Sequence, residues 1–304
     1  MKSALRMEPQ TSLSDWKAAG DWLSFRGHRI FFRHQPGPAA DSPVLLLIHG
    51  FPTASWDWAP LWSALAEDFE LLAVDMLGFG WSAKPPQHRY SILEQADLQQ
   101  AAMGHIGRNV GHVLAHDYGD TVAQELLARH LHREQGALTV ESLCLLNGGL
   151  FPECHRARPI QKVLNSPLGG LVSRLTSERL FRRSFAAVFG AQTQPGEAEL
   201  KAFWALVSDQ QGQRISHRLI KYIDERRTHR ARWVGALAAA AVPQRFINGL
   251  EDPVSGAHMV RRYRERVPAA DVVELPGIGH YPQIEAPAAV LDAMRAFHRQ
   301  LGVG

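Results

Sequence analysis

Hydrophobic and polar residues follow two alternating spacings along the 304-residue chain. Short unbroken apolar runs predict buried strands, and apolar residues three or four positions apart predict helices that pack along one face. An aromatic-rich pair of runs around Arg26-Gly27-His28 predicts an antiparallel hairpin at the edge of a sheet. The alternation of strands and helices predicts a doubly wound, mostly parallel α/β sheet. The predicted strands span residues 21–25, 29–33, 44–48, 71–74, 110–114, 143–146, 244–248 and 271–275.

This alternation is interrupted once, between residues 150 and 234. The segment has helix-like amphipathic patches and no strand-like run of comparable strength. We therefore expect a helical cap at 150–234, inserted into an α/β core formed by 1–149 and 235–304. The alanine-rich residues 236–241 are expected to form the short return from cap to core.

Composition limits the possible functions. No stretch approaches eighteen uncharged apolar residues, and Met1–Pro9 has no apolar core of a signal peptide, so we expect no membrane span and a cytoplasmic protein. Cys144 and Cys154 form no disulfide framework, and we expect both to be reduced. The fifteen histidines show no metal-binding spacing. We expect no metal and no other cofactor.

The net charge of +3 is unevenly distributed. Residues 156–233 hold 15 Lys and Arg against 6 Asp and Glu, with the densest run at Arg226–Arg232. Such a block can bind nucleic acid or an anionic surface. Because interleaved aromatics and nucleic-acid motifs are missing, we expect no nucleic-acid partner and favour a solvated helix face on the inserted segment.

The segment around Asp117 carries the most specific chemical signal. An apolar strand from Val110 changes abruptly into a helical pattern, and Ala115-His-Asp-Tyr-Gly119 at the junction has the small-x-nucleophile-x-small form of a nucleophile elbow. Where most such elbows carry serine, this chain carries aspartate. A carboxylate there attacks carbon and forms an alkyl ester with the enzyme. The alternative is that Asp117 only caps the following helix.

Two further loops follow predicted strands and supply an acid and a histidine. In open α/β sheets the reactive groups gather beyond the carboxyl ends of the strands. Asp252 follows the strand 244–248, and His280 follows the strand 271–275. The order Asp117, Asp252, His280 is that of an α/β-hydrolase triad. Alternatively, Asp252 caps a helix near Ser255 and His280 is an ordinary histidine. Glu251 competes with Asp252 as the acid.

Several motifs resemble the epoxide hydrolase and haloalkane dehalogenase side of the α/β-hydrolase superfamily. They are His49-Gly-Phe-Pro52, Asp75-Met-Leu-Gly-Phe-Gly-Trp-Ser82, Ala115–Gly119, Asp252 and Gly279-His-Tyr-Pro282. Others, including Asn147–Glu153 and Arg232–Leu237, are most similar to the branch that contains the mesoderm-specific transcript protein. The resemblance implies that the backbone N–H groups of Phe51 and Tyr118 form an oxyanion hole. It also implies that His280, oriented by Asp252, activates the water that releases the ester.

The resemblance also bears on the substrate. Haloalkane dehalogenases hold halide with side-chain N–H donors at the positions of Phe51 and Tyr118, which offer none. Epoxide hydrolases protonate the epoxide oxygen with cap tyrosines, and Tyr222 matches the second of these. No tyrosine between Phe151 and Phe203 matches the first. The alternative for Tyr222 is packing on a helix beside Leu219.

The sequence thus predicts opening of epoxides to vicinal diols on a small apolar organic substrate, with water as the second reactant, by a monomer or homodimer. Trp204 and Trp233 are expected to line the apolar pocket or to support its core. The alternatives are a haloalkane dehalogenase, an esterase of unusual type, and a non-catalytic protein that uses the fold to bind a ligand or partner.

Overall fold

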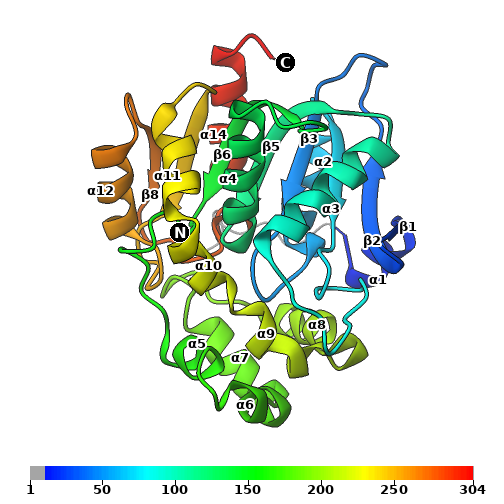
Figure 1. Ribbon diagram of the computed structural model, residues 1–304, viewed down its shortest axis with the longest axis vertical. Coiled ribbons are helices and arrows are strands. Elements are labelled where there is room, and N and C mark those ends of the chain that lie inside the picture. The colour runs from blue at the N-terminus through cyan, green and yellow to red at the C-terminus, as the bar shows by residue number, and fades with distance from the viewer. Residues whose placement is uncertain (1–10, 304) are drawn as a thin grey trace.

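The computed structural model describes residues 11–303, so the predicted absence of a signal peptide at Met1–Pro9 lies outside the described residues. Eight strands form one sheet in the order β1-β2-β4-β3-β5-β6-β7-β8 (Figure 1). The pairings β1 with β2 and β2 with β4 are antiparallel, and all others are parallel. The predicted doubly wound sheet with an edge hairpin is confirmed. The strands are β1 (Asp21–Phe25), β2 (His28–Gln35), β3 (Val44–Ile48), β4 (Glu70–Val74), β5 (Val110–His116), β6 (Thr139–Leu146), β7 (Gln244–Gly249) and β8 (Asp271–Leu275).

The central strands are buried on both faces, as their unbroken apolar runs predict. In β3 every residue is buried, and Leu47 lies between Ala73 of β4 and Leu114 of β5. β6 begins four residues before the predicted run. The prediction missed these four residues because they alternate between exposed and buried positions. Only its second half carried the unbroken pattern of a central strand.

Helices cover both faces of the sheet and bury two separate hydrophobic cores against it. The helices over one face are α3 (Ile92–His105), α4 (Tyr118–Leu131), α11 (Arg230–Ala239) and α12 (Ala257–Arg266). Those over the other face are α1 (Leu13–Ala18), η1 (Ser55–Trp58), α2 (Ala59–Leu65), α13 (Pro282–Glu285) and α14 (Pro287–Gln300). α3 begins with a capping interaction, because the Ser91 hydroxyl accepts a hydrogen bond from the Glu94 N–H at 3.2 Å.

The segment between β6 and β7 is helical throughout its regular elements. Its short helices gather beyond one end of the sheet, at the bottom of Figure 1. They are α5 (Pro159–Leu164), α6 (Gly169–Leu175), α7 (Glu178–Ala186), α8 (Glu197–Ser208), η2 (Asp209–Ile215), α9 (Ser216–Leu219) and α10 (Tyr222–Thr228), followed by α11.

α11 differs from the sequence-based expectation. Residues 236–241 were expected to form the short return from cap to core, but residues 236–239 continue the helix to Ala239, after which Ala240 adopts a left-handed conformation. Alanine has the highest helix propensity of all residues, so an alanine run extends a helix that already packs beside α4. Across residues 11–303, no helix combines the length and the apolar character that crossing a bilayer requires.

Candidate active site

Asp117 lies at a strained junction between β5 and α4. Its φ is +47°, a left-handed value that a non-glycine residue adopts at a cost. Close backbone packing accounts for the small residues around it. A Cβ on Gly119 would lie 2.3 Å from the carbonyl oxygen of Ile48, and one on Gly50 would lie 2.5 Å from Nδ1 of His116. The junction therefore has the tight geometry that the elbow motif predicts.

The Asp117 carboxylate does not cap the helix that follows it. Asp117 occupies the N-cap position of α4, but its side chain makes no capping hydrogen bond. Instead, the Phe51 N–H donates to Asp117 Oδ2 at 3.3 Å. Tyr118 opens α4, so helix geometry leaves its N–H without an intrahelical acceptor. Of the two amides expected to form an oxyanion hole, that of Phe51 contacts the Asp117 carboxylate and that of Tyr118 follows Asp117 directly in the chain.

His280 and Asp252 lie next to Asp117, at the carboxyl ends of β8 and β7. His280 Nδ1 is 2.8 Å from Asp252 Oδ2, and His280 Nε2 is 3.8 Å from Asp117 Oδ2. Asp252 is therefore hydrogen-bonded to the histidine, which resolves the competition with Glu251. The alternative of Asp252 as a helix cap does not hold, because α12 begins at Ala257 and its N-cap is Gly256.

Two residues that the sequence analysis did not assign to the site orient Asp252. Asn147 Nδ2 donates to Asp252 Oδ2 at 2.9 Å, and the Ser255 hydroxyl lies 2.7 Å from the same oxygen. The Val254 N–H donates to Oδ1 at 2.7 Å. Asn147 itself is fixed because its Oδ1 accepts the Gly249 N–H at 2.8 Å. The position of Asn147 just after β6 was the available sequence signal.

The loop that carries His280 is held by Glu285. The Glu285 carboxylate accepts the backbone N–H groups of Gly279 and Tyr281, each at 2.9 Å, on either side of His280. It also accepts the Gly190 N–H at 2.8 Å and the Thr193 hydroxyl at 2.5 Å. One buried carboxylate therefore ties the histidine loop to the segment after α7. Nothing in the sequence pattern distinguished Glu285 from other acidic residues.

A buried cation, Arg226 of α10, lies against the predicted nucleophile. Its Nη2 donates to the Asp117 carbonyl oxygen at 2.9 Å and is 3.5 Å from Asp117 Oδ1, while Nε donates to the Thr121 hydroxyl at 2.7 Å. The expectation of a solvated basic face is therefore wrong at Arg226, whereas Arg227 is exposed. The spacing along the helix indicated its burial, because Arg226 follows the buried Tyr222 by one turn and therefore lies on the same face.

The charges in this cluster are strongly coupled. Burial favours a raised pKa for Asp117, but its interaction with His280 and the charge of Arg226 outweigh burial, and its pKa lies below the usual range. Burial favours a lowered pKa for His280, but the charges of Asp252 and Asp117 raise it to about 10. The free protein therefore holds two carboxylates with a protonated histidine between them. Asp120, buried close by, has a pKa well above its usual value because burial and the charge of Asp117 both oppose its ionisation.

Tyr222 packs directly against this cluster. Its ring centroid is 4.9 Å from that of Tyr118, 6.0 Å from that of Phe51 and 4.5 Å from the Arg226 guanidinium. The side chain is buried, and its hydroxyl has no hydrogen-bond partner among residues 11–303. Burial and the charge of Asp117 raise the pKa of Tyr222, so the phenol stays protonated. Tyr222 therefore contacts Phe51, Tyr118 and Arg226, and its role as proton donor stays a prediction.

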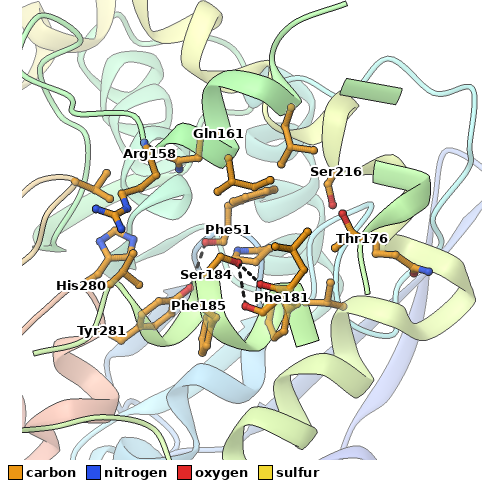
Figure 2. Close-up of a pocket in the computed structure, with 18 residues that line it drawn as sticks. Phe51, Arg158, Gln161, Thr176, Phe181, Ser184, Phe185, Ser216, His280 and Tyr281 are labelled. Atoms are coloured by element: carbon orange, nitrogen blue, oxygen red, sulfur yellow. Dashed lines mark hydrogen bonds between the residues drawn. The ribbon is translucent and has the colours of Figure 1, made fainter. Parts of the chain in front are cut away.

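A mainly apolar cavity of about 110 Å³ reaches the cluster from the helical segment (Figure 2). Phe51 and His280, which flank the Asp117 carboxylate, line it, and Tyr281 beside them donates to the Phe51 carbonyl at 3.2 Å. Asp117 and Tyr222 are not lining residues. The other walls come from Pro52, Arg158, Ile160, Gln161, Leu164, Thr176, Leu180, Phe181, Ser184, Phe185, Val188, Val207, Gln213, Ser216 and Val254.

Neither tryptophan expected near the pocket lines this cavity. Trp233 is buried and donates from Nε1 to Glu125 Oε2 at 2.8 Å, on the side of α4. Trp204 packs against Phe181, which is itself a lining residue. The alternative expectation, that these tryptophans support the core, is the one that holds. Their indole N–H groups therefore offer nothing to a ligand in this cavity.

Comparison with known proteins agrees with this architecture. The sequence profile of the alpha/beta hydrolase family matches residues 45–293. The mesoderm-specific transcript homolog protein of Homo sapiens is 42% identical over 299 residues, covering 95% of this chain and 89% of that protein. A putative hydrolase, LipZ, of Mycobacterium tuberculosis is 42% identical over 284 residues, covering 93% and 96%.

Solved structures share the fold at lower sequence identity. A haloalkane dehalogenase variant, DbeA-M1, from Bradyrhizobium elkanii superposes with a TM-score of 0.78 at 20% identity, covering 93% of this chain and 97% of the other. The epoxide hydrolase CorEH superposes with a TM-score of 0.73 at 19% identity, covering 93% and 99%. The resemblance drawn from the sequence motifs is confirmed, and the chain belongs to the alpha/beta hydrolase family.

Proposed function

We propose that this hydrolase opens epoxides to vicinal diols through an ester formed on Asp117. The observation that carries the proposal is a carboxylate at the elbow, 3.8 Å from a histidine that a second carboxylate holds by its other ring nitrogen. A carboxylate that attacks an alkyl carbon forms a stable ester, whereas attack on an acyl carbon would form a reactive anhydride. The elbow residue therefore favours a substrate with an electrophilic alkyl carbon.

The first step forms the ester and opens the ring. Asp117 attacks a ring carbon, the C–O bond breaks, and the oxygen leaves as an alkoxide that must receive a proton because it is otherwise a poor leaving group. Tyr222 is the proposed donor. Its hydroxyl is buried, protonated and without a hydrogen-bond partner among residues 11–303, so no other acceptor competes for its proton.

The second step releases the diol. A water deprotonated by His280 attacks the carbonyl carbon of the ester, and the tetrahedral oxyanion lies against the N–H groups of Phe51 and Tyr118. Collapse of this intermediate expels the diol oxygen, which takes the proton of the hydroxyl group that water added, so the Asp117 carboxylate is restored and His280 is left protonated as in the free protein. We treat the helical segment between β6 and β7 as the cap that encloses both steps.

The charge coupling explains how His280 can act as a base only when it is needed. In the free protein the two carboxylates keep it protonated, with a pKa of about 10. Ester formation removes the charge of Asp117, and the pKa of His280 then falls because one of its two stabilising anions is gone. The histidine then passes its proton to the tyrosinate that the first step leaves on Tyr222, which restores the phenol and makes the neutral ring able to take a proton from water.

Two alternatives fit the site less well. Halide displacement needs N–H donors for the departing anion, and the side chains of Phe51 and Tyr118 carry none. A non-catalytic binding role leaves the ordered histidine without a purpose, since Asp252, Asn147 and Glu285 are all engaged in fixing its ring or its loop.

The decisive experiment traps the ester. The His280→Gln variant, incubated with a styrene-oxide-like epoxide, should accumulate a mass increase equal to one epoxide on the peptide that contains Asp117. Asp117→Asn should show no adduct, and His258→Gln, which changes a part-buried histidine on α12 outside this cluster, should turn over without accumulating one. Short haloalkanes are tested in parallel, with halide release as the measurement.

The possible outcomes distinguish an ester mechanism on Asp117, dehalogenation and a non-catalytic binding role. An adduct on another side chain, with turnover intact, would remove Asp117 from the mechanism. Halide release without diol formation would assign the protein to dehalogenation. Absence of turnover and of adduct on every electrophile tested would leave the binding role as the better explanation.

A further inference from the structure

Exposed apolar side chains are concentrated in one part of the molecule. Among residues 11–303, six large hydrophobic side chains are exposed, and five of them lie between positions 163 and 180. These five are between 39% and 70% exposed, and we call them the apolar ridge. Monomeric proteins scatter exposed hydrophobic residues singly, so a cluster of this kind marks an interaction surface. The ridge consists of Val163, Leu168, Leu171, Leu175 and Leu180.

The ridge follows one face of a short helix. Leu168, Leu171 and Leu175 are spaced three and four residues apart along α6 and its N-cap, which places them on the same side. α5, which carries Val163, packs against α6. Figure 1 shows α6 at the extreme end of the molecule, beyond α5 and α7. The part of the ridge on α6 therefore lies at this end of the helical segment, and α5 and α7 carry the rest of it.

Exposed cations lie on the same three helices as the ridge. Lys162, Arg174, Arg179 and Arg183 are all exposed, and none of them forms an ion pair with another residue of the described chain. Residues 156–190 contain seven Lys and Arg and one acidic residue, Glu178. The basic block seen in the sequence thus shares its helices with an apolar surface, a combination typical of segments that lie in the interface of an anionic membrane.

The active-site cavity reaches the surface at the ridge. Leu180 belongs to the ridge and also lines the cavity, and it is 41% exposed. Leu164 and Thr176, which lie next in sequence to Val163 and Leu175, are lining residues as well. An apolar molecule dissolved in a surface that the ridge contacts would therefore reach the lining of the cavity without passing through water.

We infer that the ridge docks this protein onto the surface of an anionic phospholipid bilayer. The leucines insert at the boundary between head groups and acyl chains, and the exposed cations of the same helices contact lipid phosphates. A second copy of the chain is a poorer occupant, because two copies joined at their ridges would oppose two strongly positive faces. The inference concerns binding and does not depend on the reaction proposed above.

Co-sedimentation with lipid vesicles tests the inference. Wild-type protein should bind vesicles that contain phosphatidylglycerol and should bind phosphatidylcholine vesicles much less. Leu171→Ser combined with Leu175→Ser should weaken binding about 100-fold, since burial of each leucine contributes about tenfold. Val110→Ser alters the remaining exposed hydrophobic residue, which is on β5, and should leave binding unchanged.

The cations are tested in the same assay. Arg174→Gln combined with Arg183→Gln should weaken binding to anionic vesicles about 25-fold, because each basic residue near such a surface contributes about fivefold. Arg299→Gln, an exposed arginine on α14, is the matched control. None of these residues lines the cavity, so turnover of a water-soluble substrate should be unchanged in every variant.

Three results would overturn the inference. Wild-type protein that does not bind anionic vesicles contradicts it directly. Equal loss in Val110→Ser and in the leucine variant would mean that the ridge has no special role. If vesicle binding is absent and the leucine variant changes the sedimentation coefficient from dimer to monomer, the ridge is a contact between copies of the chain.

Discussion

Replacement of Arg226 by methionine tests whether the buried cation holds the nucleophile in place. Methionine keeps most of the aliphatic stem but removes the hydrogen bonds to the Asp117 carbonyl and the Thr121 hydroxyl, together with the ion pair at 3.5 Å. Each hydrogen bond that involves a charged group contributes about 1.5–3 kcal/mol. Loss of one partner of a buried ion pair costs about 3–5 kcal/mol. Both routes lead to an expected loss of about 3–5 kcal/mol.

The assay is urea unfolding, with the free energy of unfolding obtained by linear extrapolation. Arg227→Met is the matched control on the same helix. Its side chain is 64% exposed and, among residues 11–303, pairs only with Asp224, so the expected change is within about 0.5 kcal/mol. In an Asp117→Asn background Arg226→Met should cost less, because the ion pair is already gone while the two hydrogen bonds remain. If Arg226→Met is no less stable than Arg227→Met, the proposed role of the cation is wrong.

Three further predictions concern the acid donor, the histidine and the elbow. Tyr222→Phe should lower kcat for epoxide opening about 100-fold while leaving the fold intact, because the alkoxide then lacks its proton donor; an unchanged kcat measured by diol formation would exclude the role. His280 has a pKa raised to about 10, so the stability it contributes is complete below its unfolded pKa near 6.5 and is lost as the pH rises through about 10. Chemical denaturation across this range should show that loss in the wild type and not in His280→Gln. Gly119→Ala should cost about 3 kcal/mol or prevent folding, since its Cβ would lie 2.3 Å from a backbone oxygen, whereas Gly104→Ala, with open space around it, should stabilise by about 0.5 kcal/mol in thermal unfolding.

Features set by local pattern could be predicted from the sequence. The strand ends after β5, β7 and β8 were visible as apolar runs that stop at turn residues, and the topology rule then brought Asp117, Asp252 and His280 to one edge. The structure places His280 between the two carboxylates, 2.8 Å from Asp252 and 3.8 Å from Asp117. The sheet and its edge hairpin followed from the same patterns.

Features set by contacts between distant elements could not be predicted from the sequence. Arg226 was read as part of a solvated basic face, because its burial depends on α10 packing over Thr121, about one hundred residues earlier in the chain. Glu285 looked like any other acidic residue until the segment after α7 came to lie beside it. The extension of α11 through its alanines was missed for a different reason. The high helix propensity of alanine sets the end of this helix, and the prediction used only the spacing of apolar residues, which gives no signal in an alanine run.

The arrangement of Arg226 also constrains how molecules enter and leave. Its guanidinium anchors α10 to the backbone of the very residue that would become esterified, so swinging α10 outward would break that anchor and leave a charge buried without partners. The half of the helical segment formed by α5, α6 and α7 has no such attachment to Asp117. Substrate and product are therefore expected to enter and leave by movement of α5, α6 and α7, while α10 stays fixed against Asp117.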